Sequence, residues 1–353
     1  MKSTSDIISN FKPWTVIVVT SLITIAGCSS TPRQPAPAEL SGQTMGTEYH
    51  VKIVTDSTLP ESEIQILSAA IDTMLAEINR QMSVYDENSE ISAFNKFNDT
   101  DWFPVSIATS RVVAHSISVS ELTSGAFDIT VGPLVNLWGF GPSPDSGQIP
   151  GDEQIENALD NVGYYRLAVR SSPPAVKKEF VGAQSDLGGV AKGYGVDQIA
   201  GIIRGRGYAN YLVEIGGEVC ASGVNQNGVP WQVGVQKPGT DFGTVATVSL
   251  NNICMATSGD YQNYFEKDGV RYSHLIDPRT GRPITHNLAS VTVIDQTCIR
   301  ADALATGLNV LGPEAGWELA NELGLAAQFV TREGDGFVVR NTQRFEKYLL
   351  QNK

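Results

Sequence analysis

The stretch DLGGVAKGYGVDQIAGIIRGRGYANYLVEI, residues 186–215, passes from a glycine-rich turn through a helical pattern to a strand-like run. A helix is predicted over 191–205 with Asp186 as its cap, followed by a strand over YANYLVEI. A capped helix start needs only Asp186, whereas this one also carries several glycines, each costing up to ~1 kcal/mol of helix propensity. We therefore expect another group, such as an anion attracted by the free N–H groups and the helix dipole, to approach this backbone closely.

Apolar residues elsewhere recur at helical spacing or alternate as in strands. Residues three or four apart predict a helix over 61–82 through the stripe Ile64, Leu67, Ile71, Leu75, Ile78 and Met82. Shorter helices are predicted over 108–122, 152–161, 300–311 and 313–323, and strands at TEYHVKIV, WQVGVQ, TVATVSL, ASVTVID and AAQFVT. Because these helices and strands do not alternate regularly, the pattern favours an α+β fold.

The composition is that of an ordinary globular protein, with 41% hydrophobic and 18% charged residues among 353. The formal net charge of −13, together with the lack of a local Lys/Arg cluster, argues against nucleic acid as a partner. The sequence contains no GxxxxGK[ST], HExxH or post-strand GxGxxG motif. The common nucleotide-binding and zinc signatures therefore do not apply.

The N-terminus has the pattern of a secretory signal. Residues 13–27, PWTVIVVTSLITIAG, are apolar and uncharged, and their length suits a signal-peptide core better than a membrane-spanning helix. The small residues before Cys28 resemble the bacterial lipobox, in which the signal is cleaved and the cysteine carries a lipid. An ordinary secretory signal or an anchor helix is the alternative. We thus divide the chain into a signal peptide at 1–27, a proline-rich tether at 28–40 and a folded domain at 41–353.

Three further cysteines, Cys220, Cys254 and Cys298, show no CxxC spacing. This spacing supports neither a cysteine-based zinc site nor a framework of several disulfides. At most one bridge can form, and buried free thiols are the expected state.

A carboxylate and a hydroxyl lie four residues apart in ADALATGL, residues 301–308. At this spacing Asp302 and Thr306 share one face of the predicted helix. Both are hard oxygen ligands, which suit Mg²⁺ shared with substrate phosphates. An exposed polar pair on an amphipathic helix is the alternative.

Another candidate lies in YSHLIDPRTG, residues 272–281, where Asp277, Pro278 and Gly281 predict a tight turn. The turn does not account for His274, which comes at the end of the strand-like run before it. His274 is either a core histidine or a reactive group held by a rigid strand end.

Eight motifs in this order resemble the ApbE family of bacterial FAD:protein FMN transferases. They cover residues 41 to about 325 and read TMGTEY, MSVYDENSEISAFN, GAFDITVGPLV, DLGGVAKGYGVD, YLVEIGGEV, ATSGDYQNY, SHLIDPRTG and ADALATGL. The resemblance implies an α+β fold in which a mixed sheet is flanked by helices and FAD lies in a central cleft. The lipobox also fits this family.

Carried over position by position, the resemblance implies a Mg²⁺ site and an FAD site. The metal ligands would be the carbonyl of Gly189 and the side chains of Asp302 and Thr306. The implied FAD contacts are Met45, Tyr85, Ala126, Phe127, Asp128, Asp186, Lys192, His274 and Ile299. Lys192 stands where some members carry glutamate, so its contact would differ. His274 and Asp302 are the implied catalytic residues, with His274 as general base.

The implied reaction transfers FMN from FAD to a Thr or Ser hydroxyl of a partner protein through a phosphodiester, releasing AMP. Implied acceptors are flavin-carrying subunits of membrane redox complexes, such as the Na⁺-pumping NADH:quinone reductase and Rnf-type complexes. The enzyme would be anchored through Cys28 on the extracytoplasmic, periplasmic face of a membrane. One alternative is a metal-dependent FAD pyrophosphatase that yields FMN and AMP, and another is a flavin-binding lipoprotein without turnover.

Overall fold

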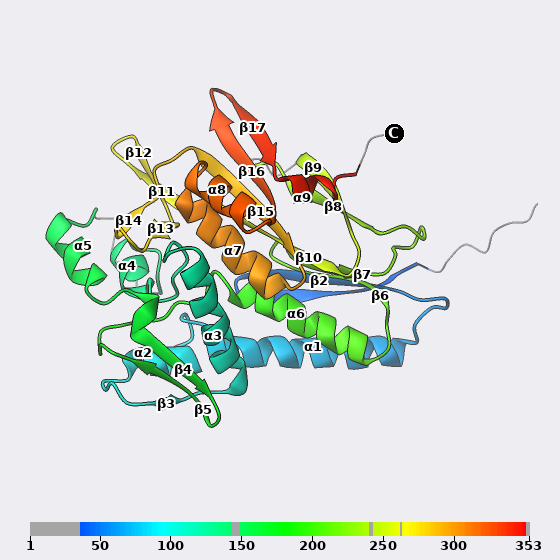
Figure 1. Ribbon diagram of the computed structural model, residues 1–353. Helices are drawn as coiled ribbons and strands as arrows, with labels where there is room; N and C mark the ends of the chain where they lie inside the picture. Colours follow the sequence, from blue (N-terminus) through cyan, green and yellow to red (C-terminus); the bar gives the residue numbers. More distant parts are fainter. Residues whose placement is uncertain (1–35, 143–148, 240–242, 262, 351–353) are drawn as a thin grey trace, which may run out of the picture. The chain divides into compact units, whose positions relative to one another are not determined.

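The computed structural model describes residues 36–142, 149–239, 243–261 and 263–350 (Figure 1). The predicted signal peptide, Cys28 and all but the end of the tether lie outside these residues. None of the helices in this described part is long and apolar enough to cross a membrane.

The main sheet of the described chain runs in the order β1-β2-β6-β7-β10-β15-β16-β17. Its strands are β1 (Ala38–Thr44), β2 (Thr47–Val54), β6 (Asn210–Ile215), β7 (Glu218–Ser222), β10 (Ile253–Gly259), β15 (Leu288–Asp295), β16 (Ala326–Glu333) and β17 (Gly336–Asn341). The α+β class is confirmed, but each neighbouring pair is antiparallel, so the sheet is not mixed. Several neighbouring strands, such as β6 and β7, are joined by a short hairpin turn, and two strands joined in this way can pair only antiparallel.

The folded domain begins earlier than the predicted boundary at Ser41. β1 starts at Ala38, whose backbone pairs with Ile53 of β2, and Leu40 is buried at 6% exposure. The last residues of the predicted tether therefore belong to the sheet, because Leu40 supplies apolar area that a tether would leave in water.

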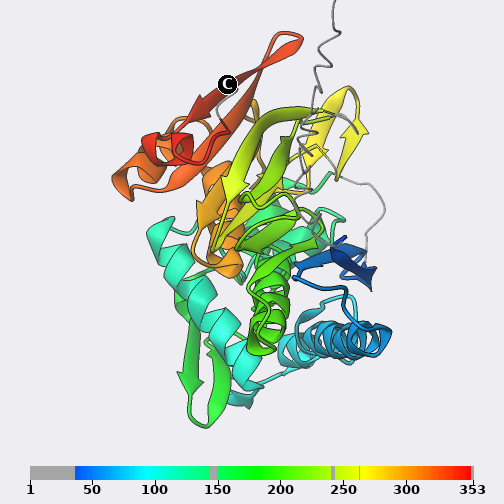
Figure 2. The same ribbon diagram turned by 90° about the vertical axis from the view of Figure 1, so that its right-hand side faces the viewer.

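Three helices cover one face of the sheet, namely α1 (Glu61–Met82), α6 (Ala191–Gly205) and α7 (Cys298–Leu311). Figures 1 and 2 show α6 lying between α1 and α7. The predicted stripe of α1 is buried at Leu67, Ile71, Leu75, Ile78 and Met82. The predicted spans of α1 and α6 are confirmed, because an apolar stripe at helical spacing must face the core.

The other face of the sheet packs against β8 (Trp231–Gln236), β9 (Thr244–Leu250) and α9 (Gln343–Glu346). The chain between α1 and α6 forms a helical region with a small sheet in the order β3-β5-β4. Its elements are α2 (Glu90–Lys96), β3 (Phe103–Pro104), α3 (Ile107–Leu122), α4 (Gly132–Leu137), α5 (Asp152–Leu159), a 3₁₀ turn at Tyr164–Arg166, β4 (Leu167–Ser171) and β5 (Pro174–Lys178). The helix α8 (Ala315–Glu322) follows α7.

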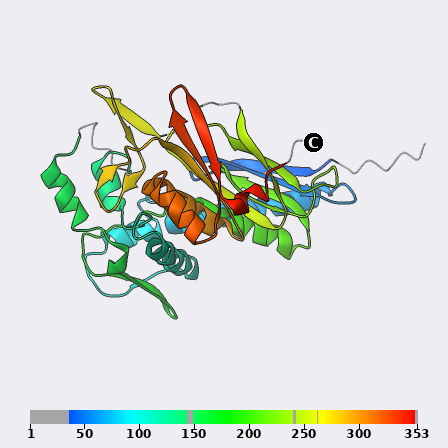
Figure 3. The same ribbon diagram turned by 45° about the horizontal axis from the view of Figure 1, so that its top comes forward.

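Two small hairpins follow β10 and carry the YSHLIDPRTG stretch. They are formed by β11 (Tyr264–Lys267) with β12 (Val270–Ser273), and by β13 (Ile276–Asp277) with β14 (Arg282–Pro283). The first hairpin projects from the main sheet in yellow (Figure 3). The predicted turn is confirmed, because Gly281 has a positive φ of 71° and donates its N–H to the carbonyl of Asp277 at 2.8 Å.

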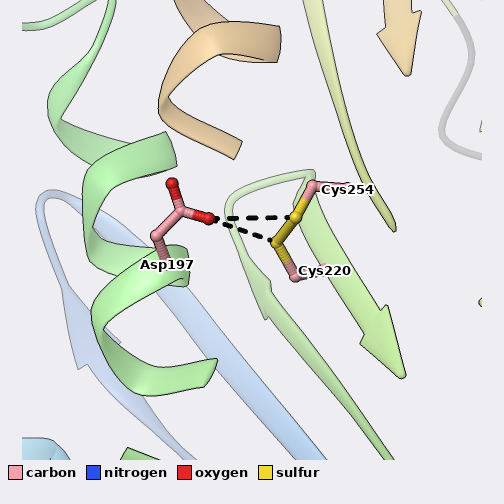
Figure 4. A group of neighbouring side chains, drawn as sticks. All are labelled: Asp197, Cys220 and Cys254. Carbon is pink, nitrogen blue, oxygen red and sulfur yellow. Dashed lines mark hydrogen bonds between the residues drawn. A yellow bond between two sulfur atoms is a disulfide. The ribbon is translucent and has the colours of Figure 1, made fainter. Parts of the chain in front are cut away.

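A disulfide joins Cys220 of β7 to Cys254 of β10, while Cys298 is a buried free thiol (Figure 4). Among these three cysteines the one bridge agrees with the sequence limit of at most one, whereas the expected free-thiol state holds only for Cys298. The two bridged residues are directly opposite each other in the β7–β10 ladder, a position that brings Cβ atoms within bonding reach. Their sequence separation of 34 gave no indication of this pairing.

Asp197 of α6 lies beside this disulfide, with its Oδ1 atom 3.5 Å from the Cys220 sulfur (Figure 4). The three side chains are close enough to hold a metal ion, but the two sulfurs are bonded to each other. The carboxylate of Asp197 also accepts the N–H groups of Cys298 and Ile299 at 2.9 and 3.0 Å. Asp197 thus caps the start of α7 and fixes this helix to α6.

Candidate active site

A cavity of about 470 Å³ opens between the glycine turn before α6, the start of β7, the end of β10 and the base of the β11–β12 hairpin. Its lining includes all but one of the site residues that the sequence implied: Met45, Tyr85, Ala126, Phe127, Asp128, Asp186, Gly189, Lys192, His274, Asp302 and Thr306. Residues far apart in the sequence therefore meet at one place.

Ile299 is the exception, because it does not line this cavity. It lies in the first turn of α7, where its backbone N–H bonds to Asp197 and its side chain packs on the core. Ile276 of β13 lines the cavity instead. Glu218, which follows the Gly216–Gly217 turn, also lines the cavity from β7, although it is not among the implied FAD and metal contacts.

Asp186 does not cap α6, contrary to the sequence prediction. The helix starts at Ala191, and the Asp186 carboxylate instead accepts the N–H of Gly188 at 2.8 Å. This bond closes the turn in front of the helix. Burial raises the pKa of the Asp186 carboxyl.

The carboxylate that reaches the start of α6 is Asp302, whose Oδ2 accepts the N–H of Gly193 at 2.9 Å. A Cβ atom on Gly193 would lie 2.5 Å from the carbonyl oxygen of Cys298. The glycine at this position is therefore required by α7, which crosses α6 at close range. The sequence predicted that an anion would approach the start of α6, and at Gly193 that anion is the Asp302 carboxylate.

Three residues that carry oxygen donors, Gly189, Asp302 and Thr306, line the same cavity. A Cβ atom on Gly189 would lie 3.4 Å from the hydroxyl of Thr306, so the glycine turn lies directly against α7. Asp302 lies one helical turn before Thr306 and is 4% exposed. Within the described residues the Thr306 hydroxyl makes no hydrogen bond to the protein. A carbonyl, a carboxylate and a hydroxyl are the hard donors that Mg²⁺ prefers, so these residues fit that ion.

A buried charge cluster adjoins these residues. The ammonium of Lys192 lies 2.7 Å from Glu218 and 4.0 Å from Asp302. Burial lowers the pKa of Lys192, but the charges of Asp302 and Glu218 more than offset this effect, and the net direction is upward. Burial raises the pKa of Glu218 to about 8, against the opposing effect of Lys192. Lys192 is thus held as a cation beside the oxygen ligands.

His274 directly follows β12, at the base of the hairpin. Its ring Nδ1 lies 2.8 Å from the carbonyl oxygen of Asn263. Because a carbonyl can only accept, Nδ1 carries the proton and Nε2 keeps a free lone pair. Burial lowers the pKa of His274, so the imidazole is neutral near pH 7. This state is the one that a general base requires.

Aromatic rings form the outer wall. Tyr85 is 69% exposed and donates its hydroxyl to the carbonyl of Phe140 at 3.2 Å. The Phe140 ring in turn lies 6.4 Å from the His274 ring, centroid to centroid. The exposed ring of Tyr85 can stack on a planar ligand.

Two charged residues near the cavity are occupied by other bonds. Asp128 accepts hydrogen bonds from Thr130 and Tyr164 through both oxygens, and burial raises its pKa. Arg279 is bound by both carboxylate oxygens of Asp277 at 2.8 Å. Its guanidinium is therefore engaged within the turn and does not line the cavity.

Hard oxygen donors, a glycine turn and a neutral histidine around one cavity are the groups that an enzyme needs to transfer phosphate-linked groups. The chain belongs to the ApbE family, whose sequence pattern matches residues 45–329.

Similar proteins cover nearly the whole chain. A Vibrio cholerae protein named FAD:protein FMN transferase is 41% identical and covers 95% of this chain and 98% of its own length. The Escherichia coli K12 protein of that name is 40% identical over 96% of this chain and 98% of its own. The solved structure of the flavin transferase ApbE from Vibrio cholerae matches with a TM-score of 0.81 at 41% identity, covering 89% of this chain and all of that one. The apo flavinyl transferase ApbE of Pseudomonas stutzeri matches with a TM-score of 0.81 at 39% identity, covering 89% and 97%.

Proposed function

We propose that this chain transfers FMN from FAD to a Thr or Ser hydroxyl of a partner protein and releases AMP. The supporting observation is that His274, Asp302, Thr306 and the Gly189 turn line the same cavity. The relatives named FAD:protein FMN transferase support the same reaction. In this reaction the acceptor oxygen bonds to the phosphorus of the FMN half, and the bond from that phosphorus to the oxygen shared with AMP breaks.

His274 supplies the base. Its Nε2 lone pair takes the proton of the acceptor hydroxyl, while the Nδ1–H bond to Asn263 keeps the ring oriented. General-base help of this kind contributes about 10²- to 10⁴-fold in rate. The exposed ring of Tyr85 is the surface on which a flavin or adenine ring can stack.

Gly189, Asp302 and Thr306 would hold Mg²⁺, which supplies charge neutralisation for the diphosphate. Lys192 adds a second positive charge at this end of the cavity. Asp302 orients α6 through Gly193, and Glu218 holds the ammonium of Lys192 in place. The side chains thus set the position of the diphosphate relative to His274.

We propose that the acceptors are flavin-carrying subunits of membrane redox complexes, of the Na⁺-pumping NADH:quinone reductase or Rnf type. The lipobox-like sequence before Cys28 and the proline-rich stretch after it support a lipid-anchored enzyme on the extracytoplasmic side of a membrane. A tether of this composition would let the folded domain reach acceptors in the same membrane.

The reaction is tested by incubating the purified mature chain with FAD and Mg²⁺, with and without a candidate acceptor protein. We expect AMP release that depends on the acceptor, together with a gain in acceptor mass equal to one FMN group. Fast AMP release without acceptor would favour the pyrophosphatase, and tight FAD binding without AMP would favour a flavin-binding protein. Thr306→Val should raise the Mg²⁺ concentration needed for transfer, whereas His274→Asn should slow transfer and leave Mg²⁺ binding intact.

A further inference from the structure

The orientation of His274 depends on a single carbonyl. Both its backbone N–H, at 3.1 Å, and its ring Nδ1, at 2.8 Å, bond to the carbonyl oxygen of Asn263. Asn263 belongs to the connection that leads from β10 into β11, at the opposite side of the hairpin base. Any shift of the Asn263 carbonyl would therefore turn the imidazole.

Asp260, which directly follows β10, forms a partly buried ion pair with Arg332. Asp260 is 6% exposed, and its two carboxylate oxygens accept hydrogen bonds from Arg332 of β16 at 2.9 and 2.5 Å. The backbone of Asp260 is held as well, because its carbonyl accepts from Arg271 of β12 at 2.6 Å and its N–H donates to Ala289 at 3.1 Å. Asp260 thus joins the hairpin connection to both β15 and β16 of the main sheet.

The need for such an anchor follows from the hairpin itself. A two-stranded ribbon is marginally stable in water, and β11 pairs with β12 alone in its sheet. A buried bidentate pair is costly to desolvate and is weak evidence for stability by itself. Its geometric effect is definite, however, because two parallel hydrogen bonds fix both distance and direction.

We propose that Arg332 and Asp260 are positioning residues for His274, which hold the Asn263 carbonyl where it directs Nε2 toward the acceptor oxygen. Neither residue lines the cavity, so the pair acts on the position of Asn263 and not on the substrate. The inference rests on the proposed role of His274 as the base.

The test is a double-mutant cycle between Arg332→Gln and His274→Asn, with FMN transfer at saturating FAD and acceptor as the readout. A displacement of about 1 Å in a catalytic group can cost on the order of 10²-fold in rate. We expect Arg332→Gln to lower kcat by about 10- to 100-fold with unchanged FAD affinity, and to have little further effect when His274 is already Asn. If Arg332 had only a structural role, Arg332→Gln would lower kcat by the same factor in the parent and in the His274→Asn variant.

Two further variants complete the design. Arg206→Gln removes a more exposed ion pair far from the hairpin, in which Arg206 lies 3.0 Å from Glu63 of α1, and it should leave kcat unchanged. Asp260→Asn keeps one oxygen that can accept from Arg332 and leaves no unpaired carboxylate in the protein, so this variant should fold. It loses the second of the two parallel hydrogen bonds, so its kcat should still fall. Binding of FAD, followed by its fluorescence, identifies variants that remain folded.

The possible outcomes separate the two hypotheses. If His274→Asn transfers FMN at the parent rate, the proposed base is wrong. If that variant is slow but both Arg332→Gln and Asp260→Asn keep the parent kcat, or if Arg332→Gln acts equally in both backgrounds, the positioning role alone is overturned.

Discussion

The sharpest prediction concerns Gly193, where α6 and α7 cross. A Cβ atom at this position would lie 2.5 Å from the carbonyl oxygen of Cys298 and 2.8 Å from the Cβ of Asp302. Both neighbours belong to the backbone or to the stem of α7, so the two helices must separate by several tenths of an ångström. Gly193→Ala thus displaces Asp302 and lengthens its bond to the Gly193 N–H.

Two opposing effects set the size of the change in stability. Overpacking of a tight contact costs about 1–3 kcal/mol, and replacing glycine by alanine within a helix recovers about 1 kcal/mol. We expect Gly193→Ala to lower the free energy of unfolding by up to about 2 kcal/mol, which is at most roughly 8 °C in Tm for a larger domain. Because Asp302 moves, transfer activity should fall by at least about tenfold.

Gly201 provides a matched control in the same helix, because no atom lies within 4 Å of a Cβ placed there. Gly201→Ala should raise the free energy of unfolding by about 0.5–1 kcal/mol and leave the transfer rate unchanged. Thermal unfolding and AMP release would be measured side by side for both variants. If Gly193→Ala matches Gly201→Ala in stability and rate, the close crossing of α6 and α7 does not control the site.

Three other predictions follow from buried groups. Lys178→Met should lower the free energy of unfolding by about 2–4 kcal/mol in urea titrations, because the three N–H groups of the fully buried Lys178 ammonium are shared among four backbone carbonyls within hydrogen-bond distance; an unchanged midpoint would contradict this. Burial lowers the pKa of His274, so kcat should fall only when the pH drops below the ordinary histidine value of about 6.5, and an acid limb above that value would argue against a buried base. Replacing both Cys220 and Cys254 by Ser should cost about 4 kcal/mol of stability, estimated from their separation of 34 residues, and equal Tm values for oxidised parent and double variant would refute it.

Local patterns predicted much of this structure. The apolar stripe of α1 and the alternation in β2, β8 and β9 gave elements with the observed bounds, since each depends on residues close in sequence. The cavity residues were found through motifs, each short and continuous. What the sequence did not reveal depends on contacts between distant segments, as in the Cys220–Cys254 bridge or the approach of Asp302 to Gly193.

The position of Ile299 outside the cavity lining could not be read from the sequence for the same reason. Ile299 and Ile276 are equally apolar, and only the crossing of β13 over the cavity decides which of them lines it. The ion pair of Asp260 with Arg332 joins residues 72 positions apart, and no spacing rule connects them. Asp260 and Arg332 can be recognised as partners only once β10 and β16 are known to belong to one sheet.

The shared use of Asp302 has a consequence for how this site can vary. One of its oxygens accepts the N–H of Gly193 in α6, and only the other, which lies 4.0 Å from the Lys192 ammonium, would meet the proposed ion. A substitution there would alter the junction of two helices together with the affinity for the ion. Variation in ion preference among related proteins should therefore appear first at the hydroxyl of Thr306, which can change without disturbing that junction.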